Sequence, residues 1–266
     1  MRSLIIRILA LVFLLVFLCS GLQLYQIYSE YKAAEEQYKE LEQYVSVPLT
    51  SLPELVREDA EGEEQAEVQE TEMLQCPQVD FDVLREINPE VVGWLIIEGT
   101  RINYPVVQGE DNEFYLTHQF DGQNSSSGCL FLDVKNDGSF QEFNQIIYGH
   151  YMKNHSMFHD LLNYKSQEYF DAHPEGWLIT PSAAYRLQFF SGYVSDVFGD
   201  AWNSSFSKKE YLEWLSDCKE RSAFSSDAVP TADSRVLTLS TCSYEFQNAK
   251  FVLHAVLDMQ SSFENE

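Results

Sequence analysis

Residues 79–260 consist mostly of short runs of β-branched and aromatic residues separated by turn residues. The first clear run, residues 91–97, is followed by Gly99-Thr100 and then by a second run at 102–107. Further runs lie at residues 129–133, 145–148, 177–180, 185–190, 235–239 and 251–257. Many short, turn-separated strands are typical of a closed or nearly closed β-barrel. Because about 180 residues can bury one sizeable core, we predict a single, mainly β domain over 79–260.

A short helix is predicted over residues 81–88, before the first strand, and is ended by Pro89. Helical patterns interrupt the strands at residues 157–163, 167–172 and 207–218. The last segment begins with the capping-box pattern Ser-x-x-Glu, formed by Ser207 and Glu210. We expect Tyr211, Leu212 and Leu215 to lie on one apolar face of this helix.

Residues 1–25 contain an apolar run from Leu4 to Leu24, interrupted mainly by Arg7, Ser20 and Gln23. This length reaches the roughly 20 residues that span a bilayer. A cleaved secretory signal has the same basic start and apolar centre, but Cys19-Ser20-Gly21 is followed by bulky residues and makes a poor cleavage site. We therefore predict an uncleaved, single-pass signal anchor in the cell membrane. Arg2 and Arg7 favour a cytoplasmic N-terminus and an extracellular remainder.

Residues 26–78 are predicted to be a helical stalk followed by an acidic linker. Residues 54–72 carry nine acidic side chains against Arg57 alone, a charge block typical of a disordered spacer. The net charge of −25 also argues against nucleic acid as a partner, because phosphates require Lys and Arg patches. Residues 261–266 are left as a tail.

Two motifs indicate thiol chemistry. Thr238-Leu239-Ser240-Thr241-Cys242 ends a β-type run with a cysteine, and Tyr148-Gly149-His150-Tyr151-Met152 places a histidine just after another run. A free cysteine is most often a buried small apolar residue, but Cys242 precedes the polar turn 243–248 and is expected at a strand end. There its thiolate can attack a substrate while His150 holds or returns the proton.

Other readings of the cysteines and histidines have less support. The five cysteines show no regular spacing, which predicts neither a disulfide framework nor a zinc site. His150, His155 and His159 could be read as a metal cluster, but their spacing fits no common zinc pattern.

Both motifs closely resemble those of the sortases, the transpeptidases that attach proteins to Gram-positive cell walls, and their TLSTC and YGHYM forms look most like class B. The resemblance continues through residues 81–94, 104–116, 131–136 and 156–158, in family order. It implies an eight-stranded sortase-type β-barrel with additional N-terminal and inter-strand helices, preceded by one transmembrane helix. In class B the helix corresponding to residues 207–218 forms one wall of the substrate groove.

The resemblance also implies a reaction. Cys242 would attack the Thr carbonyl of a C-terminal sorting motif of the Pro-x-Thr-Gly/Asn type, and His150 would protonate the departing amine. An amine of a peptidoglycan precursor or cross-bridge would then resolve the acyl-enzyme. The partners implied are exported proteins with a C-terminal sorting signal, and neither a cofactor nor a metal is required. Five residues would line the substrate groove by motif match: Asn112, Leu116, Tyr148, Ser240 and Thr241.

One position departs from the family. The resemblance implies an arginine eight residues after the cysteine, on the antiparallel return strand, where it stabilises the oxyanion; this chain has Lys250 there. The short turn should lay Lys250 beside Cys242 on the neighbouring strand, as the third catalytic residue. Lysine keeps the positive charge but lacks the planar fork of two parallel donors. Three hypotheses follow: a working enzyme that uses Lys250, a slow enzyme, or a sortase-like module that binds peptides without turnover.

A different transpeptidase family offers a second comparison. Ser126-Ser127-Gly128-Cys129 is similar to the Ser-x-Gly-Cys core of L,D-transpeptidases, but the arginine expected two residues later is Phe131. The required upstream His-Gly-Thr is also missing from the sequence. Within the sortases, the TLSTC form and the N-terminal anchor favour wall anchoring over pilin linkage.

Overall fold

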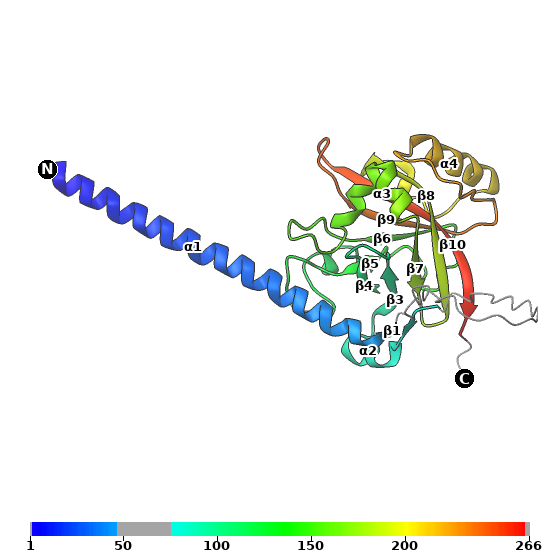
Figure 1. Ribbon diagram of the computed structural model, residues 1–266, viewed down its shortest axis with the longest axis horizontal. Coiled ribbons are helices and arrows are strands. Elements are labelled where there is room, and N and C mark those ends of the chain that lie inside the picture. The colour runs from blue at the N-terminus through cyan, green and yellow to red at the C-terminus, as the bar shows by residue number, and fades with distance from the viewer. Residues whose placement is uncertain (1, 47–75, 264–266) are drawn as a thin grey trace, which may run out of the picture.

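The computed structural model describes residues 2–46 and 76–263 (Figure 1). The acidic stretch 54–72, and with it most of the predicted linker, lies outside the described residues, as does the tail from residue 264 onward.

Eight strands form a closed barrel in the order β10-β8-β7-β3-β4-β5-β6-β9. Their bounds are β3 Val91–Ile96, β4 Asn103–Val107, β5 Leu130–Leu132, β6 Asn144–Tyr148, β7 Glu175–Ile179, β8 Ala183–Asp196, β9 Val236–Cys242 and β10 Ala249–Ser262. The β4–β5 and β6–β9 pairs are parallel and the other neighbours are antiparallel. The predicted mainly β, eight-stranded barrel is confirmed.

The two-residue period of the strands separates two apolar cores. On β10, Phe251 and Leu253 belong to the main core, whereas Val252 between them packs beneath helix α4 (Lys208–Arg221). Alternate side chains of a strand point to opposite faces, so one strand serves both cores.

Helix α4 begins as its sequence predicts. The Ser207 hydroxyl accepts from the Glu210 amide at 3.3 Å, and the Glu210 carboxylate accepts from the Ser207 amide at 2.9 Å. The expectation for Leu212 is wrong, because its side chain is 49% exposed. The buried face carries Tyr211, Trp214, Leu215 and Cys218, at the i, i+3, i+4, i+7 spacing of one helix face. Leu212, one residue after Tyr211, is turned off that face.

The connection after β6 is less helical at its start than predicted. It contains the 3-10 helix η3 (His159–Lys165) and then α3 (Gln167–Ala172). A start at Met157 is prevented because this residue has a φ of 54°, and its amide donates to the Tyr104 hydroxyl at 3.2 Å. The remaining short helices are α2 (Phe81–Ile87), η2 (Phe114–Leu116) and η4 (Asp200–Trp202).

The N-terminal helix α1 is continuous from Arg2 to Leu41, 40 residues in all. Its apolar part is exposed and is long enough to cross a membrane. Figure 1 shows α1 extending away from the barrel, with its C-terminal end against it. There Ala34, Tyr38 and Leu41 are buried, so the polar segment expected to be a stalk also packs on the barrel domain. The chain continues through η1 (Glu42–Tyr44) and β1 (Val45–Ser46), which pairs with β2 (Gln78–Val79).

Candidate active site

The ends of two parallel strands bring the cysteine and histidine motifs together. Tyr148 of β6 is in register with Ser240 of β9, and the Gly149 amide donates to the Ser240 carbonyl at 3.1 Å. The Thr241 hydroxyl donates to the Gly149 carbonyl at 2.8 Å. His150 and Cys242 follow directly, so both lie at the same end of the barrel.

Cys242 contacts a cation on the next strand. It ends β9 half-buried and is paired with Lys250 of β10, as the eight-residue spacing across a short turn predicts. The Lys250 Nζ lies 3.1 Å from the Cys242 Sγ. An ammonium group at this distance can stabilise negative charge on sulfur.

The His150 ring is oriented by a backbone carbonyl. Its Nε2 lies 2.7 Å from the Leu116 carbonyl oxygen. Because a carbonyl can only accept, Nε2 carries a hydrogen and donates it, which leaves Nδ1 as the other ring nitrogen available for proton exchange. Within residues 76–263, no hydrogen bond joins His150 to Cys242.

The five residues predicted to line the groove differ in exposure. Leu116 is 37% exposed, whereas Ser240 and Thr241 are each only 2% exposed. The Asn112 side chain accepts from the Val134 amide at 2.9 Å. The Tyr148 hydroxyl donates to the carboxylate of Asp133 at 2.7 Å.

Tyr148, Ser240 and Thr241 lie on the strand ends that lead to His150 and Cys242, and the Leu116 carbonyl bonds the His150 ring. Contact of all five side chains with a peptide stays a prediction. Burial and the bond to Asp133 raise the pKa of Tyr148 above its ordinary value, so this hydroxyl remains a neutral donor.

Comparison with known proteins gives one consistent family. No family model matches the chain. The chain is 30% identical to Sortase B of Staphylococcus aureus over 239 residues, covering 90% of this chain and 88% of that protein. It is 32% identical to Sortase B of Listeria monocytogenes over 177 residues, covering 65% and 72%. Among solved structures, a B. anthracis sortase B in complex with AAEK1 has a TM-score of 0.71 at 30% identity, covering 88% of this chain and 100% of that chain.

The chain belongs to the class B sortases. Members of this family are cysteine transpeptidases, so the sortase is an enzyme by relationship and the non-catalytic alternative is not favoured.

Beside Cys242 this sortase has three bonded polar side chains, called the clamp below, that the sequence does not predict. The Glu245 carboxylate, in the turn after Cys242, accepts hydrogen bonds from the Ser243 hydroxyl and from Lys165 of η3. These bonds lower the pKa of Glu245 to about 2. The clamp joins the β9–β10 turn to η3. Ser243 and Glu245 were visible beside the motif, but nothing in the sequence connects them to Lys165.

Two of the three histidines weighed as a metal cluster, His155 and His159, lie in an aromatic group. The His159 ring stacks on Tyr151 at 4.5 Å and lies 4.1 Å from the His155 ring. Tyr151 also meets Tyr244 edge-on at 5.6 Å, which bridges the loops that follow the histidine and the cysteine. Across residues 2–46 and 76–263, no three His, Cys, Asp or Glu side chains are grouped to hold a metal.

Two other cysteines of this sortase are buried away from solvent and are poor nucleophiles. Cys129 and Cys218 are buried, and burial raises the pKa of both thiols to about 12. Their thiols therefore stay protonated at neutral pH. This burial argues against the L,D-transpeptidase hypothesis, which requires Cys129 as the nucleophile.

Proposed function

We propose that this sortase cleaves exported proteins at a C-terminal motif of the Pro-x-Thr-Gly/Asn type and transfers the new acyl end to a cell-wall amine. The observation that carries the proposal is the Cys242–Lys250 contact of 3.1 Å at the strand end next to His150. One solved sortase B is described as a substrate complex and another as a complex with triglycine, whose amine illustrates the acceptor class.

The reaction is an acyl transfer in two steps. The Cys242 thiolate attacks the Thr carbonyl carbon, a C–S bond forms, and the peptide C–N bond breaks as His150 gives a proton to the departing amine. The acceptor amine then attacks the thioester and gives a proton to His150 while a new C–N bond forms. The C–S bond breaks, the Cys242 thiolate leaves, and His150 is again in its protonated form. Lys250 stabilises the negative charge that develops on the carbonyl oxygen in both steps.

The substrate would bind across the ends of β6 and β9. Asn112, Leu116 and Tyr148 contact the sorting peptide, and the buried Ser240 and Thr241 shape the floor on which it lies. In this proposal α1 spans the cell membrane with Arg2 and Arg7 inside, and the barrel works outside on proteins that carry the sorting signal and on peptidoglycan-linked amines.

The test uses Cys242→Ala and His150→Ala in the full-length chain. Each change should abolish cleavage of a sorting peptide and formation of the thioester, detected by intact-protein mass spectrometry. The matched controls are Cys76→Ala, at another half-buried cysteine, and His155→Asn, at an exposed histidine with a φ of 66° that Asn tolerates. Both controls should keep the parent rate. Substantial turnover by either active-site variant would remove this mechanism.

A further inference from the structure

The end of helix α1 is bonded to the segment that packs against His150. The Tyr38 side chain is 4% exposed, and its hydroxyl donates to the Gly128 carbonyl at 2.6 Å. Its ring meets Tyr104 edge-on at 5.2 Å, which fixes the direction of the hydroxyl. Nearer the N-terminus of the same helix, the Glu30 carboxylate accepts a hydrogen bond from the Ser126 amide at 3.4 Å. The helix therefore contacts the 125–129 segment at two points.

Gly128 in turn lies directly against the catalytic-site loop. It has a φ of 61°. A Cβ at this position would stand 2.5 Å from the Tyr115 carbonyl oxygen, 3.0 Å from the Leu116 carbonyl oxygen and 3.2 Å from Cδ2 of His150. The Leu116 carbonyl is the acceptor of the His150 Nε2 hydrogen. The following amide, that of Cys129, donates to the Tyr115 carbonyl at 3.0 Å. Gly128, η2 and the His150 ring thus form one continuous contact.

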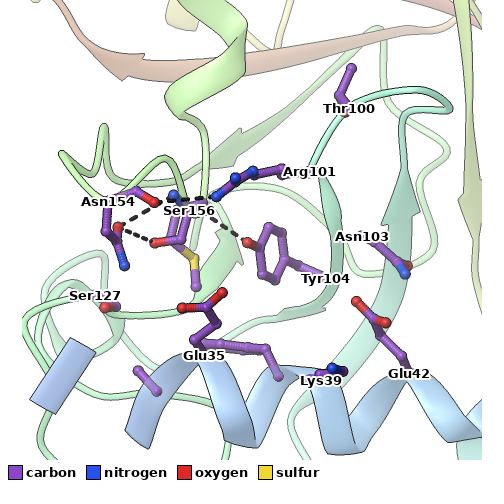
Figure 2. A pocket seen from close by; sticks show the side chains of 13 residues that line it. Glu35, Lys39, Glu42, Thr100, Arg101, Asn103, Tyr104, Ser127, Asn154 and Ser156 are labelled. Carbon is purple, nitrogen blue, oxygen red and sulfur yellow. Dashed lines mark hydrogen bonds between the residues drawn. The ribbon is translucent and has the colours of Figure 1, made fainter. Parts of the chain in front are cut away.

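The rest of this contact region is open. A cavity of about 350 Å³ lies between α1 and the barrel. Figure 2 shows Glu35, Lys39 and Glu42 of the helix across it from Arg101 and Tyr104. The Ser127 hydroxyl, also at the cavity, is 2% exposed and has no hydrogen-bond partner among the described residues. At the edge of this cavity, the Tyr38–Gly128 hydrogen bond joins the helix directly to the segment that packs against His150.

We propose that α1 orients His150 and that Tyr38 is its positioning residue, acting through Gly128 and the Leu116 carbonyl. The inference rests on the proposed role of His150 in proton transfer. It makes the membrane-proximal helix part of the active site's support, so the imidazole is best aligned when the helix is docked.

The test is Tyr38→Phe in the full-length chain in detergent, which removes the hydroxyl and keeps the ring against Tyr104. Tyr28→Phe is the matched control, since Tyr28 is on the same helix and 64% exposed. Loss of one buried hydrogen bond should lower kcat for a sorting peptide about 2- to 10-fold, with KM little changed. The control should match the parent.

A second readout needs no substrate. The ¹⁵N chemical shifts of the His150 ring report which nitrogen carries the hydrogen, and the parent should show the Nε2–H form. In Tyr38→Phe these shifts should move toward a mixture of the two neutral forms, and the Cys129 amide should exchange faster. Gly128→Ala, which forces a Cβ against the Tyr115 and Leu116 carbonyls, should move the shifts further.

The outcomes separate the two proposals. His150 shifts and kcat equal to those of Tyr28→Phe would overturn the positioning role, even if Tyr38→Phe unfolds at a lower temperature. A parent protein that lacks transpeptidase activity would refute the proposed function, and the ¹⁵N shifts would still decide whether Tyr38 orients His150.

Discussion

At the residue scale, Lys250 stands where the motif resemblance predicts an arginine. The Lys250 ammonium lies 3.1 Å from the Cys242 sulfur. In the proposed reaction the same charge serves the thiolate before attack and the carbonyl oxygen after it. A lysine can supply that charge from a single flexible point. It cannot hold a carbonyl oxygen with two donors in a fixed plane, as an arginine can.

We predict that Lys250→Ala lowers the acylation rate by about 10-fold or more, on the scale of a lost oxyanion donor. Lys250→Arg should match or exceed the parent, because it restores the two-donor geometry. The measurement is the single-turnover rate of thioester formation with a sorting peptide. Equal rates for the parent and both variants would show that the charge at position 250 plays no part.

At the element scale, a buried polar network joins β6, β9 and β10 beneath α4. The Nδ1 of His254 lies 2.8 Å from the Thr238 hydroxyl, which itself donates to the Asn144 side chain at 2.6 Å. Asn144 donates on to the carbonyls of Ala201 and Asn203. The His254 Nε2 is buried and has no partner among the described residues, so this ring is held neutral inside the apolar layer.

This network predicts a loss of stability in mild acid. Burial lowers the pKa of His254 to about 3, whereas an imidazole in the unfolded chain has a pKa of about 6.5. Between these values the unfolded state binds more protons, so the free energy of unfolding falls as the pH is lowered. From pH 6.5 to pH 5.0 the His254 contribution should fall by about 2 kcal/mol.

The measurement is the Tm of the full-length protein at pH 7.5 and pH 5.0. His254→Asn keeps a donor near the Thr238 hydroxyl but cannot take up a proton, so its Tm should fall less than that of the parent. His155→Asn, at an exposed histidine, serves as the control and should behave like the parent. An equal Tm difference in parent and His254→Asn would contradict the assignment.

At the scale of the whole molecule, one continuous helix carries both the apolar run and the barrel contact. Its 40 residues correspond to about 60 Å at the rise of an α-helix, twice the thickness of a bilayer core. The first half can therefore cross a membrane while the second half reaches the barrel. The active site would then stand at a set height above the membrane.

We predict that the full chain stays with membranes and that Cys242 reacts with a membrane-impermeant thiol reagent added outside intact cells. Because Cys76 is also half-buried, labelling should be measured in a Cys76→Ser background, with Cys242→Ala as the blank. Recovery from the medium of a soluble form that begins near residues 20–30 would instead support a cleaved signal.

The sequence by itself determined the features that depend on near neighbours. The runs of β-branched and aromatic residues between turn residues predict the strands. Ser207 and Glu210 predict the start of α4, and the motifs around His150 and Cys242 indicate the chemistry. Local backbone geometry sets the strands and the helix start, because the interacting residues lie within a few positions of one another. The motifs supply the residue types for the chemistry, whereas the meeting of His150 and Cys242 depends on the pairing of β6 with β9. The placement of Lys250 beside Cys242, predicted from the eight-residue spacing, is confirmed, because a short turn returns the chain on the adjacent strand.

Only the tertiary structure decided the contacts between distant segments. Nothing local links Lys165 to Glu245 or Tyr38 to Gly128, residues that lie 80 and 90 positions apart and meet because the barrel closes and α1 docks. The exposure of Leu212 and the late start of η3 have the same origin, since packing against other elements selects the buried face and the backbone angles. Secondary-structure propensity depends on neighbours along the chain, whereas burial and hydrogen bonding depend on neighbours in space. The contacts of Lys165 and Tyr38 around the candidate active site therefore could not be predicted from the sequence.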